Sequence, residues 1–242
     1  MHIKTCNLSY HYRTHTVIDN LNLQVYKGAK VGLLGPNGCG KTTLLKLIAG
    51  LIKPSTGDIY IDNIPLTLYK RSTLASEVGL MMQHAPVSLD LTVKQVVALG
   101  RMRQTCPQAL QQVLLENDLN HIAHFSYNQL SGGQHQRVMF AQLQYQNPRL
   151  SLLDEPANHL DINHTYQVLS KIKLQNNTSI ASYHCFNLAA RFCDQLVLMK
   201  QGQILIAGDV EQVLTPYWIK LAYDVDVEIL RNSRGTPLVS IC

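Results

Sequence analysis

Long apolar runs are absent from this 242-residue chain. No uninterrupted apolar stretch approaches the ~20 residues that a membrane-spanning helix needs. The opening stretch, MHIKTCNLSY, has no apolar run of the kind found in secretory signals. Internal repeats and low-complexity linkers are absent as well. We therefore expect a soluble protein that stays in the cytosol, built as one large domain or as one core with a smaller lobe attached.

Charged residues are also few. They make up 15% of the chain, whereas hydrophobic residues make up 46%, which is typical of a well-buried globular protein and not of a disordered one. The net charge is +5, but the basic residues are dispersed, and the densest group, RMR at 101–103, is too short to follow a nucleic-acid backbone. We therefore predict no nucleic-acid partner, and we interpret the basic residues as a solvated face or a protein-docking surface.

The pattern of apolar residues predicts an α/β fold. Residues 3–10 and 17–26 are typical of strands, because apolar and polar side chains alternate along them. From about residue 84 to 149 the pattern becomes helical, and over 150–206 strands alternate with helices. Such alternation favours a mostly parallel sheet covered by helices on both faces. The helical segment is then an inserted lobe, and we expect the tail from residue 216 onward to be less regular.

A glycine-rich loop carries the strongest functional signal. The stretch GPNGCGKTT at 35–43 matches G-x-x-x-x-G-K-[ST], and it lies between the apolar run VGLL and the helical-looking LLKLIAG. Glycines let successive backbone N–H groups turn toward a phosphate, and the helix that follows adds the positive end of its dipole. Lys41 can then bridge the terminal phosphates, and the Thr42 hydroxyl is placed to bind Mg²⁺. A chance match at an ordinary turn is the alternative, but the flanking strand and helix favour a nucleoside triphosphate.

The cysteines lack the spacing of a metal site. No CxxC pair and no neighbouring His-rich cluster occurs among them, and they stand at Cys6, Cys39, Cys106, Cys185, Cys193 and Cys242. In a cytosolic chain, free thiols are the ordinary reading. The thiol of Cys39 lies inside the glycine loop, where a helix N-terminus favours a reactive thiolate. A small residue that merely fits the loop is the alternative, and it is the interpretation we favour.

A second phosphate-type motif follows further along the chain. The stretch LSGGQHQRVMF at 130–140 places Ser131, Gly132 and Gly133 directly before a helical run, which is again an anion-binding helix N-terminus. Considered alone, it would be an ordinary capped helix start. However, the chain carries two phosphate-type sites and only one lysine among them. One nucleotide held between two copies of the chain reconciles the two sites, and we therefore predict a head-to-tail dimer that buries two nucleotides.

A pair of acids follows a predicted buried strand. In RLSLLDEPANHLD, at 149–161, Asp154 and Glu155 emerge at the carboxyl end of that strand, which is where α/β sheets keep their ligands. Asp154 would hold Mg²⁺, usually through water. Glu155 is placed to accept a proton from an attacking water, or to orient it. An ordinary surface acid pair is the alternative, and the glycine loop makes the catalytic interpretation the better one.

Together these residues resemble the ATPase subunit of an ABC transporter across essentially the whole chain. GPNGCGKT resembles the Walker A loop of that family, LSGGQ its signature motif and LSLLDEP its Walker B strand. The resemblance implies a P-loop NTPase core with a mostly parallel sheet, an N-terminal antiparallel β-subdomain and an inserted α-helical subdomain. It predicts a single domain over 1–242. Its parts are the core with the antiparallel β-subdomain at 1–83 and 150–215, the helical subdomain with the signature motif at 84–149, and a C-terminal extension at 216–242.

The resemblance also implies ATP and Mg²⁺ as ligands, with a role for each matching residue. The phosphates are bound by Gly35, Pro36, Asn37, Gly38, Cys39, Gly40, Lys41, Thr42 and Thr43. A partner chain completes the cage with Ser131, Gly132, Gly133 and Gln134. The metal residues are Thr42, Gln83 and Asp154, and the catalytic residues are Glu155, His184 and Lys41.

Four of the implied positions come from the family pattern alone. Gln83, in MMQHAP, matches the glutamine that senses Mg²⁺ and couples to the membrane subunit. His184 matches the switch histidine that meets the γ-phosphate, and Asp161 resembles the aspartate at the dimer interface. Tyr12 resembles the aromatic residue that stacks on adenine, with Tyr10 as a rival.

A finer resemblance concerns the transported cargo. LTVKQVVALGR and the tail YDVDVEILRNSRGTPLV are similar to the importers of iron–siderophores, haem and cobalamin. This implies an ATPase homodimer on the cytoplasmic face of the inner membrane, bound to a permease dimer that receives cargo from an extracytoplasmic substrate-binding protein. The alternatives are a zinc or manganese importer, an exporter or lipid-handling ATPase, a soluble ABC protein acting on nucleic acid, and a degenerate regulatory subunit.

The chain departs from the family pattern at a few positions. DEPT reads DEPA, with Ala157, and the usual Arg of the signature helix is Gln142. Around the switch histidine, THD reads YHC, with Tyr183 and Cys185. None of these changes removes a catalytic group. Losing the acid at position 185 could alter the orientation of His184, and we therefore expect an active enzyme with slow turnover.

Overall fold

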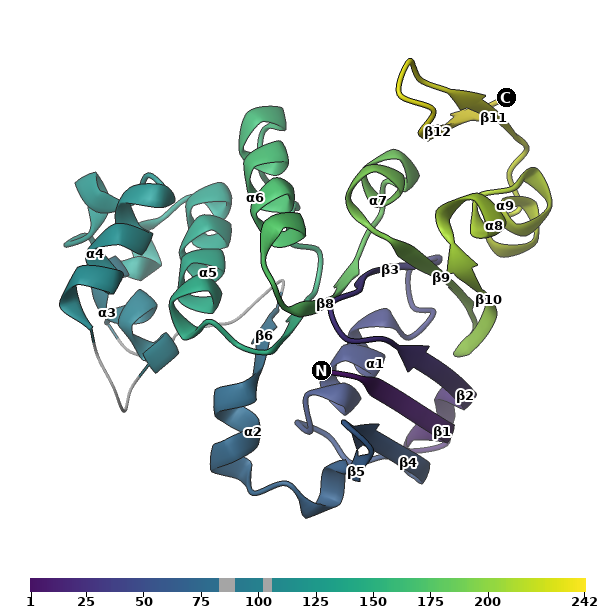
Figure 1. Ribbon diagram of the computed structural model, residues 1–242, viewed down its shortest axis with the longest axis horizontal. Coiled ribbons are helices and arrows are strands. Elements are labelled where there is room, and N and C mark those ends of the chain that lie inside the picture. Colours follow the sequence, from purple (N-terminus) through teal and green to yellow (C-terminus); the bar gives the residue numbers. More distant parts are fainter. Residues whose placement is uncertain (83–89, 102–105) are drawn as a thin grey trace.

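The central sheet of the chain has six strands. The computed structural model describes residues 1–82, 90–101 and 106–242, and Figure 1 shows its arrangement. The strands lie in the order β10 (Gln203–Asp209), β9 (Gln195–Lys200), β3 (Lys30–Leu34), β8 (Thr178–Ser182), β7 (Leu150–Leu153) and β6 (Val78–Met81). Neighbouring strands run parallel, except that β10 is antiparallel to β9. This sheet confirms the predicted mostly parallel α/β fold.

An antiparallel sheet lies beside the central one, as the family resemblance implies. Its strands lie in the order β2 (His15–Val25), β1 (Ile3–Tyr12), β4 (Thr56–Ile61) and β5 (Ile64–Pro65). Leu21, Leu23 and Val25 are buried while the polar residues between them are exposed, because alternate side chains of a strand point to opposite faces. Helix α1 (Lys41–Ile48) is buried along its apolar face and joins both sheets in one hydrophobic core.

The helices between β6 and β7 gather on one side of the molecule (Figure 1). They are α3 (Val93–Ala98), α4 (Pro107–Glu116) and α5 (Gly132–Gln146), with the short 3-10 turns η2 (Leu99–Arg101), η3 (Asn120–Ile122) and η4 (Tyr127–Gln129). They share a core of their own, which includes Val97, Leu114 and Tyr145. Among the described residues, no helix combines the length and the apolar character that crossing a membrane requires.

The remaining helices cover the rest of the fold. They are η1 (Leu66–Leu68) and α2 (Arg71–Glu77), which lead into β6, and α6 (Ile162–Leu174), α7 (Phe186–Phe192), α8 (Val210–Val213) and α9 (Pro216–Tyr223). The chain then ends in an antiparallel hairpin of β11 (Val227–Arg231) and β12 (Pro237–Ile241).

The expectation of a less regular tail is therefore wrong. The turn of the hairpin is held by the Asn232 side chain, which accepts hydrogen bonds from the backbone N–H groups of Arg234 (2.9 Å) and Thr236 (3.0 Å). Gly235 has the positive φ of 79° that this turn requires. Asparagine and glycine are turn residues for these reasons, so NSRG carried a hairpin signal that was missed.

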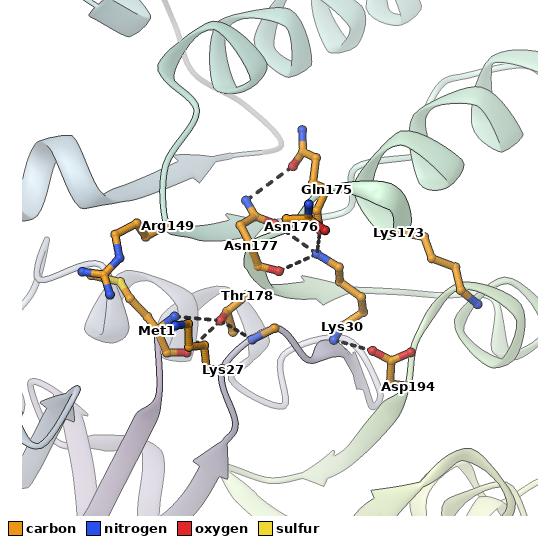
Figure 2. A pocket seen from close by; sticks show the side chains of 11 residues that line it. Met1, Lys27, Lys30, Arg149, Lys173, Gln175, Asn176, Asn177, Thr178 and Asp194 are labelled. Atoms are coloured by element: carbon orange, nitrogen blue, oxygen red, sulfur yellow. Dashed lines mark hydrogen bonds between the residues drawn. The ribbon is translucent and has the colours of Figure 1, made fainter.

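A basic pocket of about 480 Å³ opens at the amino end of the parallel strands (Figure 2). The Lys30 ammonium at this edge donates to the backbone carbonyls of Gln175 (2.7 Å) and Asn177 (2.5 Å) and to the Asn177 side-chain oxygen (3.1 Å). Burial lowers the Lys30 pKa, and Asp194 offsets this only in part. The lysine thus fastens the loop before β8 to β3. Ligands of such sheets bind at the opposite edge, where the sequence motifs lie.

Candidate nucleotide-binding site

The glycine loop connects the carboxyl end of β3 to the start of α1. Gly35, Gly38 and Gly40 have φ values of 151°, 78° and 106°, a region that L side chains rarely adopt. A Cβ atom on Gly35 would lie 2.3 Å from the carbonyl oxygen of Met199, and one on Gly40 would lie 2.9 Å from that of Val17. The loop therefore needs glycine at both positions, and it leads directly into the N-terminus of a helix, which is the geometry that binds phosphate.

Lys41 is the first residue of α1, and its side chain is buried. Its ammonium folds back over the loop and donates to the backbone carbonyls of Gly35 (2.6 Å) and Pro36 (3.2 Å). The charge is thus held by neutral acceptors of the loop itself, with no carboxylate among its hydrogen-bond partners in the described residues. A phosphate is a stronger partner for an ammonium than a carbonyl is, so a bound nucleotide would exchange these bonds for its own.

Thr42 and Asp154 are brought together from opposite halves of the chain. Asp154 follows β7 and is buried, and its Oδ2 accepts a hydrogen bond of 2.7 Å from the Thr42 hydroxyl. Its Oδ1 accepts one of 2.8 Å from the Ser182 hydroxyl. A hydroxyl and a carboxylate side by side are the hard oxygen ligands that Mg²⁺ prefers. The residues present therefore fit the predicted metal site.

Glu155 and His184 form the second part of the acidic edge. A carboxylate oxygen of Glu155 contacts Nε2 of His184, and its other oxygen accepts from the Asn158 amide at 2.9 Å. Glu155 has a left-handed backbone (φ 53°), a strained conformation for this residue type that is concentrated at functional sites. The carboxylate is 15% exposed and the imidazole 48%. A water molecule can therefore reach the Glu155 carboxylate, whose position is fixed by Asn158 and His184.

Three supporting side chains were not predicted from the sequence. The Ser182 hydroxyl accepts from the backbone N–H of Glu155 (2.8 Å) while donating to Asp154, so it positions both acids. Gln136 donates to the backbone carbonyl of Glu155 (2.8 Å), and Asn158 holds its carboxylate. Ser182 could have been found, because it is a polar residue at the carboxyl end of a fully buried strand.

The signature residues lie at the start of α5, where Ser131 and Gly132 are exposed and Gly133 and Gln134 are partly buried. Ser131 caps this helix: its hydroxyl accepts from the backbone N–H of Gln134, whose side chain accepts from the Ser131 N–H at 2.9 Å. This reciprocal pair is a capping box. In the parts of the chain that the structure describes, Ser131, Gly132, Gly133 and Gln134 form no hydrogen bond to the glycine loop of the same chain. They are free for a second copy.

The residues assigned by family pattern alone have distinct surroundings. Tyr12 ends β1 with 64% of its surface exposed, whereas its rival Tyr10 is partly buried against the core, so Tyr12 is the one free to stack on a base. Asp161 caps α6, and hydrogen bonds from the His164 backbone and ring lower its pKa. Gln83 lies outside the described residues.

The Cys39 thiol should react slowly, against the tendency of thiols at helix N-termini. Its side chain is 3% exposed, and burial raises its pKa, an effect that the nearby Lys41 ammonium only partly offsets. The thiolate is the reactive form, so at neutral pH we expect the exposed Cys185 to be alkylated at least tenfold faster (about 1.4 kcal/mol per factor of ten). Both rates are measured by treating the protein with N-ethylmaleimide for different times and analysing the proteolytic peptides by mass spectrometry. Equal rates would contradict the burial argument.

Comparisons with known proteins agree with this geometry. The family description "ABC transporter" matches residues 18–158. The ferric enterobactin transport ATP-binding protein FepC of Escherichia coli is 32% identical over 96% of this chain and 91% of its own length. The hemin import ATP-binding protein HmuV of Photobacterium damselae subsp. damselae is 33% identical over 95% of this chain and 92% of its own length.

Solved structures share the fold over most of the chain. A metal-chelate-type ABC transporter in an inward-facing conformation has a TM-score of 0.80 at 24% identity, covering 99% of this chain and 96% of that one. The ATP-binding cassette MJ0796, a dimer in a post-hydrolysis state with ADP and Pi, has a TM-score of 0.79 at 27% identity, covering 86% of this chain and 98% of that one. The chain therefore belongs to the ABC transporter family, as an ATPase subunit.

Proposed function

We propose that this ATPase drives the uptake of a metal complex of the iron–siderophore, haem or cobalamin type. The hydrogen bond between Thr42 and Asp154 carries the ATPase part of the proposal, because it joins the glycine loop to the acidic strand end as a MgATP site requires. Support for the cargo class comes from relatives named for ferric enterobactin transport and hemin import.

In the proposed mechanism, two copies close head to tail on two nucleotides. The loop amides and Lys41 hold the phosphates, and Tyr12 stacks on the base. Ser131, Gly133 and their neighbours from the second copy complete the γ-phosphate cage, which agrees with the exposure of Ser131 and Gly132 in the single chain. The dimeric MJ0796 cassette is a precedent for this assembly in a relative of the same fold.

Hydrolysis is assigned to the Glu155 and His184 pair. Glu155 orients water in line with the γ-phosphate, and His184 stabilises the charge that develops there. Bound Mg²⁺, held by Thr42, Asp154 and in our prediction Gln83, would neutralise charge on the phosphates. Ser182 keeps both acids in register through its two hydrogen bonds. Closure and reopening of the dimer then transmit force, through the helical lobe, to a permease at the cytoplasmic face of the inner membrane. A substrate-binding protein delivers the cargo on the far side.

The proposal is tested by isolating the chain from native membranes after mild solubilisation, with mass spectrometry of the proteins that copurify. A many-helix permease of the iron-complex importer type, together with its substrate-binding protein, is the expected result. Recovery of ribosomes, DNA, an exporter-type membrane protein or a zinc permease would leave the ATPase chemistry standing and would contradict iron-complex import.

A further inference from the structure

Helix α7 begins two residues after the switch histidine, and the side chain at its N-cap position does not cap it. Its N-cap residue is Cys185, whose side chain makes no capping hydrogen bond. Residues with a side-chain acceptor at this position normally satisfy the free N–H groups of the first turn and stabilise the helix start. The helix has only seven residues. Because His184 lies next to its N-cap residue, a shift of the first turn would also shift His184.

The C-terminal hairpin holds that first turn by a two-way polar contact. The Asn187 side chain accepts a hydrogen bond from the backbone N–H of Val239 at 2.7 Å and donates to the carbonyl of the same residue at 3.3 Å. Val239 lies in β12, 52 residues further along the chain. A side chain that pairs with both backbone groups of one residue fixes a strand against a helix in a single register, which apolar packing alone does not do.

Tyr223 makes a second contact from the tail to the same turn. Its ring, at the end of α9, packs edge to face on that of Phe186, with centroids 5.0 Å apart and an interplanar angle of 81°. The Tyr223 hydroxyl is buried and has no hydrogen-bond partner among the described residues. Burial raises the Tyr223 pKa. The ring thus packs on the first turn of α7.

These contacts converge on Phe186 and Asn187, the residues of α7 nearest to His184. Figure 1 shows the hairpin, α9 and α7 together at one end of the molecule, on the side away from the helical lobe. If the tail only covered apolar surface, polar contact at the histidine end of the helix would not be needed. We propose that the C-terminal extension positions the switch histidine, with Asn187 and Tyr223 as the positioning residues that anchor the uncapped first turn of α7.

The inference rests on the proposed role of His184 with Glu155, and the experiment uses full-length variants in steady-state ATP hydrolysis. Asn187→Ala is expected to lower kcat by roughly tenfold with KM within about twofold, because a misplaced group costs rate while the nucleotide site is untouched. Arg231→Ala is the matched control: it removes the bond of the hairpin to Glu211 (2.7 Å) and a bond within the hairpin to Gly235 (2.9 Å), neither of which involves α7. Its kcat should stay at the wild-type value.

A second variant pair separates positioning from loss of folding. Tyr223→Phe keeps the ring on Phe186 and is expected to retain full kcat, whereas Tyr223→Leu is expected to lower it. A spin label on the exposed Cys185, with the other accessible thiols Cys6, Cys106 and Cys242 replaced by Ser, should gain mobility in Asn187→Ala at temperatures where far-UV circular dichroism shows an intact fold. A lowered melting temperature with unchanged kcat and label mobility would overturn the inference.

His184→Ala distinguishes the failure of this inference from a failure of the proposed role of His184 in hydrolysis, on which the inference rests. Loss of hydrolysis in His184→Ala with full kcat in Asn187→Ala would overturn the positioning role alone. Full hydrolysis in His184→Ala would instead remove the assignment of His184 as the switch residue, and the positioning role with it.

Discussion

Replacing Glu155 with Gln is expected to reduce ATP hydrolysis by about 10²–10⁴-fold, the range for loss of a positioned general base. The amide retains the shape of the side chain, and its oxygen can still accept from Asn158, which lies 2.9 Å from the carboxylate in the wild type. It cannot accept a proton from water at neutral pH. MgATP binding should therefore survive, and the closed dimer should accumulate because its nucleotides are not hydrolysed.

Phosphate release and size-exclusion chromatography with MgATP measure the two effects. Glu228→Gln is the matched control, because Glu228 is an exposed carboxylate on β11, away from the acidic strand end. It should hydrolyse ATP at the wild-type rate and leave no trapped dimer. Hydrolysis close to wild type in Glu155→Gln would show that Glu155 is not the residue that directs water.

The architecture was predictable because the buried strands and the polar motifs that follow them are both visible in the local sequence. The apolar run ending at Leu34 is a fully buried strand, and the glycines after it occupy backbone conformations that other residues rarely adopt. The apolar run at 150–153 likewise forms a fully buried strand, and Asp154 follows it at the carboxyl edge of the sheet. Parallel strands have their carboxyl ends at the same edge of a sheet, so both motifs were expected at that edge. The hydrogen bond between Thr42 and Asp154 joins them there.

What was not predictable depends on contacts between segments far apart in sequence. The place of Ser182 at the carboxyl end of its strand could be predicted, but its two bonds to the acids follow only from the order in which β7 and β8 lie. The tail was misjudged because its strands are short and its turn signal is local, while the contact of Val239 with Asn187 crosses 52 residues. No pattern within a single segment records such a pairing.

Lys41→Met is expected to weaken nucleotide binding by about 10- to 100-fold, since hydrogen bonds to charged groups contribute roughly 1.5–3 kcal/mol and each 1.4 kcal/mol is a factor of ten. Methionine keeps the buried stem and removes the ammonium that now binds the carbonyls of Gly35 and Pro36. The loop glycines and the helix dipole remain, so binding should be weakened and not abolished.

Titration with a fluorescent ATP analogue measures this loss, and Lys46→Met provides the control. Lys46 lies in the last turn of the same helix. Its substitution therefore makes the same change of side chain in the same helix, but away from the loop. Its variant should bind nucleotide as tightly as the wild type. Equal affinities for the two variants would mean that the Lys41 ammonium stays on its carbonyls when nucleotide binds. The lysine would then support the loop without touching phosphate.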